Sequence, residues 1–331
     1  MISANLGDRY SERIWENHIS DDFARDVLHG LREKHKSIPS KYLYDALGSA
    51  LFEAIVLLPE YDLPRRERSL LQRYASAIVA NLGPSPHLLE LGSGSSEKTK
   101  MLIEAAIAND GRVDYTAIDI SLDALRAAAA QLLESYASIS VNALAGDYFQ
   151  VLAEVPRRPA TLALFLGSNL GNYPGRRGHE LLRAIGSALG PRHFLLLGVD
   201  LRKDRVTMER AYNDPIGVTA AFSKNVLARV NRELGAEIDI GNFRHRSHFD
   251  EETGSIESYL IAERSATYGL GDGRDAVSFA EGERVHVESS HKFSRDELRN
   301  LARETGFEER TYMPDDDAGF ALVLLERLED R

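Results

Sequence analysis

Five short apolar runs alternate with helical patterns through the middle of this chain of 331 residues. Apolar runs of about four to eight residues, separated by helical segments, are typical of parallel sheets, because each crossover between parallel strands needs a helix. The alternation therefore predicts an α/β fold with a doubly wound, mostly parallel sheet. The expected strands are His87–Leu91, Tyr115–Ile120, Ser140–Ala145, Thr161–Leu166 and His193–Val199.

The alternation stops after Asp200. Residues 205–235 have a helical pattern, whereas residues 243–262 and 276–288 alternate in polarity and predict an antiparallel sheet. A helix is expected at 294–306, and the apolar run Gly319–Leu328 is expected to return to the main sheet.

These patterns predict two domains, of which the second interrupts the first. We expect a first domain built from residues 62–200 and 288–331, and a second domain built from residues 1–61 and 201–287.

Composition limits the classes of function. The net charge of −11 disfavours nucleic acid as a partner, because an acidic surface repels phosphate backbones. The sequence has no cysteine, which excludes disulfides, thiolate metal sites and a cysteine nucleophile. No signal peptide and no apolar run long enough to span a membrane is visible. We expect a cytoplasmic monomer that acts on a small molecule, without a metal.

A glycine-rich segment, Glu90–Ser96, lies between the first expected strand and a helix. Gly92, Ser93 and Gly94 allow a tight turn and a close approach of the backbone to a ligand. The dinucleotide fingerprint requires a third glycine where this chain has Glu97, and a carboxylate there would repel a pyrophosphate. An NAD-dependent oxidoreductase is therefore disfavoured, and the phosphate-loop pattern is absent.

S-adenosylmethionine suits this loop better, because it has no phosphate and carries a sulfonium and an ammonium. Asp119 ends the second strand, where a carboxylate can accept hydrogen bonds from both ribose hydroxyls. Asp147 can accept one from the adenine amino group, and Tyr148 can pack on the ring. Lys98 completes the candidate cofactor residues. A partner-binding protein that keeps the fold without catalysis is the remaining alternative.

The loop, Asp119 and Gly146–Asp147 resemble the layout of class I methyltransferases over about residues 62–200. Longer strings, over about residues 20–330, resemble the histidine-specific Nα-methyltransferases of ergothioneine biosynthesis. These strings include Pro39–Glu53, Leu58–Tyr61, Leu89–Thr99, Phe165–Tyr173, Gly217–Phe222 and Glu288–Phe293.

The resemblance implies a Rossmann-like methyltransferase sheet, with a second α+β substrate-binding domain inserted and wrapped around it. It implies an enzyme that uses S-adenosylmethionine, with S-adenosylhomocysteine as product, to convert free L-histidine into its trimethylated betaine, hercynine. It places the substrate carboxylate near Asn172 and Tyr212, and the amine near Tyr44 and Gly167. The imidazole is placed at Tyr61, Glu288 and Ser290.

The chemistry of these residue types agrees with the implied roles. Asn172 and Tyr212 can donate hydrogen bonds to a carboxylate. Glu288 and Ser290 are two residues apart on an expected strand, so they face the same side and can hold both imidazole nitrogens. The carboxylate favours a ring N–H donor or an imidazolium.

One position departs from the family pattern. Ser258 stands where the histidine enzymes carry methionine against the imidazole, and a smaller side chain widens the ring pocket. Related enzymes methylate tryptophan derivatives, so another aromatic amino acid, tryptophan or tyrosine, is the alternative substrate. Glu288 favours histidine, because a carboxylate left unpaired against a carbocyclic ring costs about 1–3 kcal/mol.

The sequence contains no obvious strong base for the amine proton. Tyr44, or a water held near Asn172, is the candidate relay. His245, His248 and His291 are alternatives, although a lone histidine is more often structural or exposed.

Overall fold

The computed structural model describes residues 7–15, 19–270 and 275–329, and these divide into two compact units. The first unit comprises Met1–Asn17, Leu63–Leu201 and Phe293–Arg331, as far as these ranges are described. The second unit comprises His18–Asp62 and Arg202–Lys292, within the same limits.

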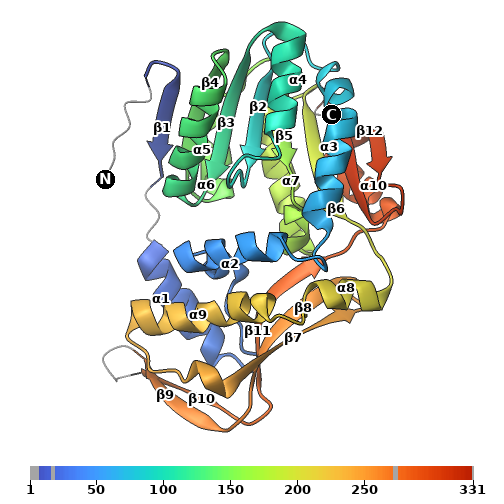
Figure 1. Ribbon diagram of the computed structural model, residues 1–331. Coiled ribbons are helices and arrows are strands. Elements are labelled where there is room, and N and C mark those ends of the chain that lie inside the picture. The colour runs from blue at the N-terminus through green and yellow to red at the C-terminus, as the bar shows by residue number, and fades with distance from the viewer. Residues whose placement is uncertain (1–6, 16–18, 271–274, 330–331) are drawn as a thin grey trace. The chain divides into compact units, whose positions relative to one another are not determined.

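An eight-stranded sheet forms the centre of the first unit, in the order β1-β4-β3-β2-β5-β6-β13-β12 (Figure 1). Neighbours from β1 to β6 are parallel, whereas β13 is antiparallel to β6 and to β12. The strand order reverses between β2 and β5, and the carboxyl ends of parallel strands at such a point commonly bind ligands. The prediction of a doubly wound sheet is confirmed. The strands are β1 (Tyr10–Ile14), β2 (His87–Leu91), β3 (Val113–Asp119), β4 (Ile139–Ala145), β5 (Thr161–Phe165), β6 (Phe194–Asp200), β12 (Phe307–Pro314) and β13 (Phe320–Arg327).

The core on one face of this sheet is formed with three helices, α6, α7 and α10. Helix α7 places Leu182, Ile185 and Leu189 along one stripe, where they join Leu197 of β6 and Val323 of β13. The expected cap of α10 is present, since Ser294 and Glu297 form a capping box. The helices of this unit are α3 (Leu63–Val79), α4 (Lys100–Asp110), α5 (Leu122–Ser135), α6 (Tyr148–Leu152), α7 (Arg176–Leu189) and α10 (Arg295–Glu304), with a single 3-10 turn, η2 (Asn169–Asn172).

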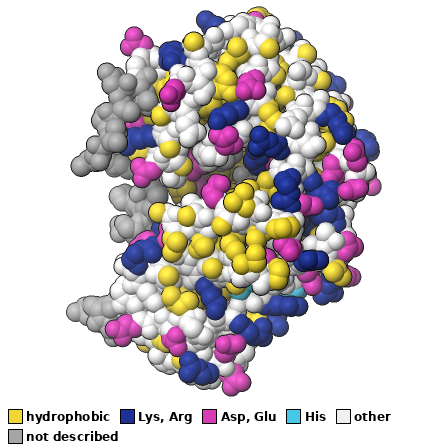
Figure 2. Space-filling view, viewed as in Figure 1, with side chains coloured by type: hydrophobic (Ala, Val, Ile, Leu, Met, Phe, Trp, Pro, Cys, Tyr) yellow, Lys and Arg dark blue, Asp and Glu magenta, His cyan; other side chains and the backbone are white. Residues whose placement is uncertain are grey.

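The second unit combines helices with two small antiparallel sheets, β11-β8-β7 and β10-β9. Helix α9 packs on α2, β7 and β8. Hydrophobic side chains gather over α2, where Leu47 and Leu57 are exposed (Figure 2). The elements are α1 (Ile19–Arg32), η1 (Ser40–Leu43), α2 (Ala46–Val56), α8 (Arg205–Ala211), α9 (Val218–Leu234), η3 (Ile240–Asn242), β7 (Phe243–Asp250), β8 (Ser255–Ala262), β9 (Ala266–Leu270), β10 (Asp275–Phe279) and β11 (Arg284–His291).

The prediction that residues 1–61 belong together is wrong at its N-terminal end. Strand β1 pairs in parallel with β4 and is an edge strand of the main sheet. Its sequence, Tyr-Ser-Glu-Arg-Ile, is largely exposed, so it carries no hydrophobic alternation that would reveal a strand.

The predicted boundary at residue 288 is also wrong, because β11 continues to His291 and the second unit extends to Lys292. The hydrogen-bonded pairing of β11 with β8 keeps Glu288 and Ser290 in the second unit. The other boundaries differ by one residue, since Asp62 lies in the second unit and Leu201 in the first.

The central position of Leu197 gives a test of the core. Leu197 is 2% exposed, and Leu197→Ala is expected to lower the free energy of unfolding by about 2–5 kcal/mol through lost packing and a cavity. Ile14, on the edge strand, is 52% exposed, and Ile14→Ala is expected to change it by less than about 1 kcal/mol. Urea denaturation followed by circular dichroism measures both, and equal losses would contradict this assignment of the core.

Candidate functional site

The glycine-rich loop lies between β2 and α4, at the carboxyl end of the sheet. Gly92 has a φ of +72° and Gly94 a φ of +49°, in the left-handed region that glycine tolerates. A Cβ added at Gly92 would lie 2.5 Å from the Tyr148 hydroxyl oxygen, whereas one at Gly94 meets no atom within 4 Å. The loop is therefore packed on one side and open at its tip. Ser93 between them is buried, and its hydroxyl has no hydrogen-bond partner in the described part of the chain.

Asp119 holds the tip of this loop. One carboxylate oxygen accepts a hydrogen bond from Gly94 N–H at 3.0 Å, and the other accepts one from Ser121 N–H at 2.9 Å. Burial raises the pKa of Asp119 in spite of these hydrogen bonds. Each carboxylate oxygen keeps a second lone pair, so the pair can also accept hydrogen bonds from two neighbouring hydroxyls of a ligand.

Asp147 and Tyr148 lie at the carboxyl end of β4. The exposed carboxylate of Asp147 caps α6 by accepting a hydrogen bond from Phe149 N–H at 2.9 Å. The ring of Tyr148 packs edge-on against Phe165, with ring centroids 5.9 Å apart. Both residues therefore have local structural roles, and the approach of the Tyr148 hydroxyl to Gly92 places them beside the loop.

The sequence analysis did not identify Glu67 of α3, which is completely buried below this loop. One carboxylate oxygen of Glu67 accepts a hydrogen bond from Gly167 N–H at 2.7 Å, and the other pairs with the Lys98 ammonium at 2.5 Å. A Cβ at Gly198 would lie 2.0 Å from Glu67 Oε1, so glycine is required there. Glu67 thus joins two predicted site residues, Lys98 and Gly167, that are far apart in the sequence. No local pattern could have revealed it.

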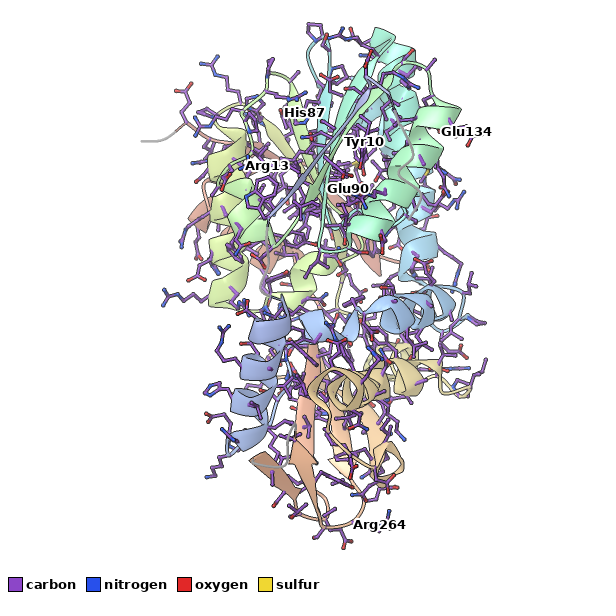
Figure 3. All side chains as sticks on the ribbon, turned by 90° about the vertical axis from the view of Figure 1, so that its left-hand side faces the viewer. Tyr10, Arg13, His87, Glu90, Glu134 and Arg264 are labelled. Atoms are coloured by element: carbon purple, nitrogen blue, oxygen red, sulfur yellow. The ribbon has the colours of Figure 1, made fainter. Side chains whose placement is uncertain are left out.

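A second buried carboxylate, Glu90, lies on β2 beside the loop (Figure 3). It accepts hydrogen bonds from the hydroxyls of Thr99, at 2.6 Å, and Tyr115. Burial raises the pKa of Glu90 to about 7. On the same strand, His87 bonds to the hydroxyls of Thr116 and Thr161, at 2.9 and 3.0 Å, within the sheet. These contacts make β2 a rigid support for the loop that follows it.

The segment after β5 has an unusual backbone. Gly167 and Ser168 both have positive φ, +73° and +58°, and the Ser168 hydroxyl accepts a hydrogen bond from Asp200 N–H at 2.9 Å. Asn172 ends the following 3-10 turn and is half-buried. Its side chain makes no hydrogen bond in the described part of the chain, so its amide is available to a ligand.

In the second unit, Glu288, Ser258 and Ser247 form a row across three strands. Glu288 of β11 lies directly opposite Ser258 of β8, which lies opposite Ser247 of β7. Directly opposed residues point to the same face of a sheet. The Ser258 and Ser247 hydroxyls are 2.8 Å apart, and Ser247 is 3.1 Å from a ring nitrogen of His245.

Glu288 is 9% exposed, and burial raises its pKa to about 7. Lys292 and His286 act in the opposite direction on this pKa, and Glu257 raises it further. The described part of the chain supplies no hydrogen bond to the Glu288 carboxylate. A buried carboxylate in this state can accept hydrogen bonds from a ligand.

Ser290 of β11 belongs to a second polar group, with Tyr212 at the end of α8 and Lys292 directly after β11. The Tyr212 hydroxyl donates to Ser290 Oγ at 2.9 Å. Lys292, which is completely buried and was not identified from the sequence, donates to Tyr212 Oη at 2.8 Å and to Ser290 Oγ at 2.9 Å. We call these three residues the Lys292 cluster.

Aromatic rings connect the remaining predicted residues of this unit. Tyr61 lies edge-on to Tyr212, with centroids 5.9 Å apart, and contacts Phe52 at 6.3 Å. Tyr44 contacts Phe52 at 5.5 Å and Phe222 at 5.4 Å. Phe52 and Phe222 were not identified from the sequence, although both fall within the matched strings.

The predicted residues thus fall into two sets, one in each unit. In the first unit, contacts join Gly92 to Tyr148, Gly94 to Asp119, and Lys98 to Gly167 through Glu67. In the second unit, they join Tyr61 to Tyr212, Tyr212 to Ser290, and Glu288 to Ser258. The first unit carries Gly92, Ser93, Gly94, Lys98, Asp119, Asp147, Tyr148, Gly167 and Asn172, and the second carries Tyr44, Tyr61, Tyr212, Ser258, Glu288 and Ser290.

The three histidines considered as bases have other surroundings. Burial lowers the pKa of His245 to about 4, so its ring is a weak base. His248 stacks on Tyr259 at 5.6 Å, and His291 bonds to the Ser255 hydroxyl at 3.2 Å. Among the described residues, no cluster of histidine and carboxylate side chains has the form of a metal site. In the same part of the chain, no helix has the length and apolar character needed to cross a membrane.

Comparison with known proteins gives matches to one family. Residues 23–327 match the family model described as histidine-specific methyltransferase, SAM-dependent. The chain is 38% identical to the histidine N-alpha-methyltransferase of Mycobacterium tuberculosis, over 93% of this chain and 97% of that protein. It is also 38% identical to the enzyme of the same name from Mycolicibacterium smegmatis, over 92% of this chain and 94% of that protein.

A fungal relative is longer. Ergothioneine biosynthesis protein 1 of Schizosaccharomyces pombe is 30% identical over 83% of this chain, which corresponds to 37% of the fungal protein. The family model covers most of the chain and both units, and the two mycobacterial proteins match over nearly their whole length. The chain therefore belongs to the histidine-specific, S-adenosylmethionine-dependent methyltransferase family.

Proposed function

We propose that this protein transfers methyl groups from S-adenosylmethionine to the α-amino group of free L-histidine, to give the trimethylated betaine. One observation carries the proposal to the substrate: the buried carboxylate of Glu288 shares a sheet face with Ser290 in a member of the histidine-specific family. The name of the fungal relative supports a place in ergothioneine biosynthesis.

The loop of the first unit fits the cofactor. The open side of Gly94 leaves room for a ligand, and Asp119 retains lone pairs for two ribose hydroxyls. We assign cofactor binding to the loop glycines with Ser93, to Lys98 and Asp119, and to Asp147 and Tyr148. When bound, S-adenosylmethionine supplies an electrophilic methyl group on a sulfonium, which needs no metal to activate it.

The second unit fits an imidazole ring. An ionised Glu288 can accept an N–H from the ring, and Ser290 can bond to the other nitrogen. A carbocyclic ring would leave the carboxylate buried and unpaired, at a cost of about 1–3 kcal/mol. Ser258 lies directly opposite Glu288, so its small side chain enlarges the space beside the ring without removing this requirement.

The remaining roles concern the amino and carboxylate groups of the substrate. Asn172 and Tyr212 are proposed to lie at the carboxylate, with Asn172 as the donor because the Tyr212 hydroxyl donates to Ser290. Tyr44 and Gly167 are proposed to lie at the amine. The amine must be uncharged to attack, so Tyr44, or a water bonded to Asn172, is proposed to relay its proton. The low pKa of His245, about 4, disfavours that residue as the acceptor. Correct orientation of two bound reactants can contribute about 7–11 kcal/mol to the rate.

The substrate proposal is tested by incubating the protein with S-adenosylmethionine and each common free amino acid, followed by mass spectrometry of the products. A trimethylated product from histidine is expected, with no product from tryptophan or tyrosine. A methylated product from either of these, without one from histidine, would replace the proposed substrate.

Asp119 tests the assignment of the cofactor. Asp119→Ala removes a charged acceptor, and each such hydrogen bond contributes about 1.5–3 kcal/mol, so affinity for S-adenosylhomocysteine should fall at least about tenfold. Asp119→Asn keeps an acceptor and should bind with intermediate affinity. Glu134→Ala, at an exposed position on α5 (Figure 3), is the matched control and should bind as the wild type does. Calorimetry that shows equal affinity for Asp119→Ala and wild type would remove Asp119 from the cofactor site.

Glu288 gives a prediction for pH. Its pKa is about 7, so the carboxylate loses its charge as the pH falls through 7, and affinity for histidine should fall with it. Glu288→Gln cannot ionise, so it should bind at least about tenfold more weakly at pH 8 and lose this inflection. Titration of the free imidazole affects both proteins equally and cancels in the comparison. Calorimetric profiles of the same shape for both proteins would show that Glu288 does not bind the ring.

A further inference from the structure

Lys292 is a buried cation whose position is fixed by the backbone. Its side chain is completely buried, and its backbone N–H donates to the carbonyl of Gly254 at 2.9 Å. It follows β11 directly, two residues after Ser290 and four after Glu288. Its ammonium lies 4.7 Å from the centroid of the Tyr212 ring. A buried lysine is costly unless its hydrogens are used, so its contacts define what it does.

Two of these hydrogens are donated within the Lys292 cluster, to Tyr212 Oη and Ser290 Oγ. An ammonium can only donate, whereas a hydroxyl has one hydrogen and two lone pairs. Ser290 Oγ therefore accepts from two donors, Lys292 and Tyr212, and both of its lone pairs are used. The hydroxyl hydrogen of Ser290 is left, and it can only be donated outward.

This hydrogen-bond count determines whether Ser290 presents a donor or an acceptor to a ligand. It presents a donor, while Glu288, on the same face, presents an acceptor when it is ionised. A neutral imidazole has one N–H and one lone pair and satisfies both residues. An imidazolium has two N–H groups, so one of them would meet the Ser290 hydrogen in addition to the positive charge of Lys292.

We propose that Lys292 is a positioning residue that makes Ser290 an obligate hydrogen-bond donor, so that the site binds the neutral, single-tautomer form of the histidine ring. The proposal rests on the proposed function and adds the form of the substrate that is recognised. Glu288 alone can accept an N–H from the neutral ring or from the imidazolium, so it does not distinguish these two forms. The Lys292 cluster distinguishes them, because the Ser290 donor and the Lys292 charge favour the neutral ring.

The test is ¹⁵N NMR of ring-labelled histidine bound to the full protein with S-adenosylhomocysteine, at a pH of about 7, where part of the free ring is protonated and part of Glu288 is ionised. The bound ring in the wild type should give one signal typical of a protonated nitrogen and one typical of a lone-pair nitrogen. Two protonated-type signals would overturn the proposal. The absence of any bound signal would instead contradict the proposed function, and this inference with it.

Lys292→Met tests the lysine itself. This variant frees a lone pair on Ser290 and removes the charge, so the bound ring should gain imidazolium character and histidine affinity should fall at least about tenfold. Lys34→Met, at an exposed lysine of the same unit, is the control and should leave both readouts unchanged. A Lys292→Met protein that binds a neutral ring as the wild type does would exclude the positioning role. If Lys292→Met does not fold, the wild-type spectrum still decides the state of the ring. Tyr212→Phe then serves as the test variant, because it removes the other donor to Ser290, and the same shift toward imidazolium is expected.

Discussion

The geometry of the first unit depends on the buried carboxylate of Glu67. Its two oxygens hold the Lys98 ammonium, next to the glycine-rich loop, and the amide of Gly167, after β5. These two segments follow β2 and β5, adjacent parallel strands at the point where the strand order reverses. Glu67 is completely buried, so removing the partly exposed Lys98 would leave an uncompensated carboxylate in the core. The contact therefore keeps the loops at the ends of β2 and β5 in a single arrangement.

The buried polar side chains of the second unit are arranged differently. Its sheet places Glu288, Ser258 and Ser247 in one row, and Ser290 of the Lys292 cluster lies on the same strand as Glu288. Most of these groups are satisfied by each other. The carboxylate of Glu288 receives no hydrogen bond from the described part of the chain, and its raised pKa reflects the cost of its burial.

Much of the fold could be predicted, because the strands from β2 to β6 are apolar runs bounded by glycine or polar turns. The same reasoning missed β1, whose exposed edge position needs no hydrophobic pattern, and β12, which was not predicted as a strand. The predicted second domain ended at residue 287, whereas β11 continues to His291. The sequence gives no signal for this end, because the strand continues into the matched segment Glu288–Phe293. Helix capping at Ser294 was visible because it is a local contact of four residues.

The residues of the candidate site also divide into those that the sequence revealed and those that it did not. Gly92, Asp119 and Glu288 could be identified because a motif or a strand end marks each of them. Glu67 and Lys292 could not be identified from the sequence. The partners of Glu67 are distant in the sequence, and the role of Lys292 follows from a hydrogen-bond count that requires coordinates. Both are completely buried charged residues that touch predicted site residues. Buried charge is rare and costly, so its presence beside a site is a physical reason to look for a role there. Sequence patterns therefore point to the groups that we propose to bind ligands, whereas the buried charged residues that contact those groups emerge from the structure.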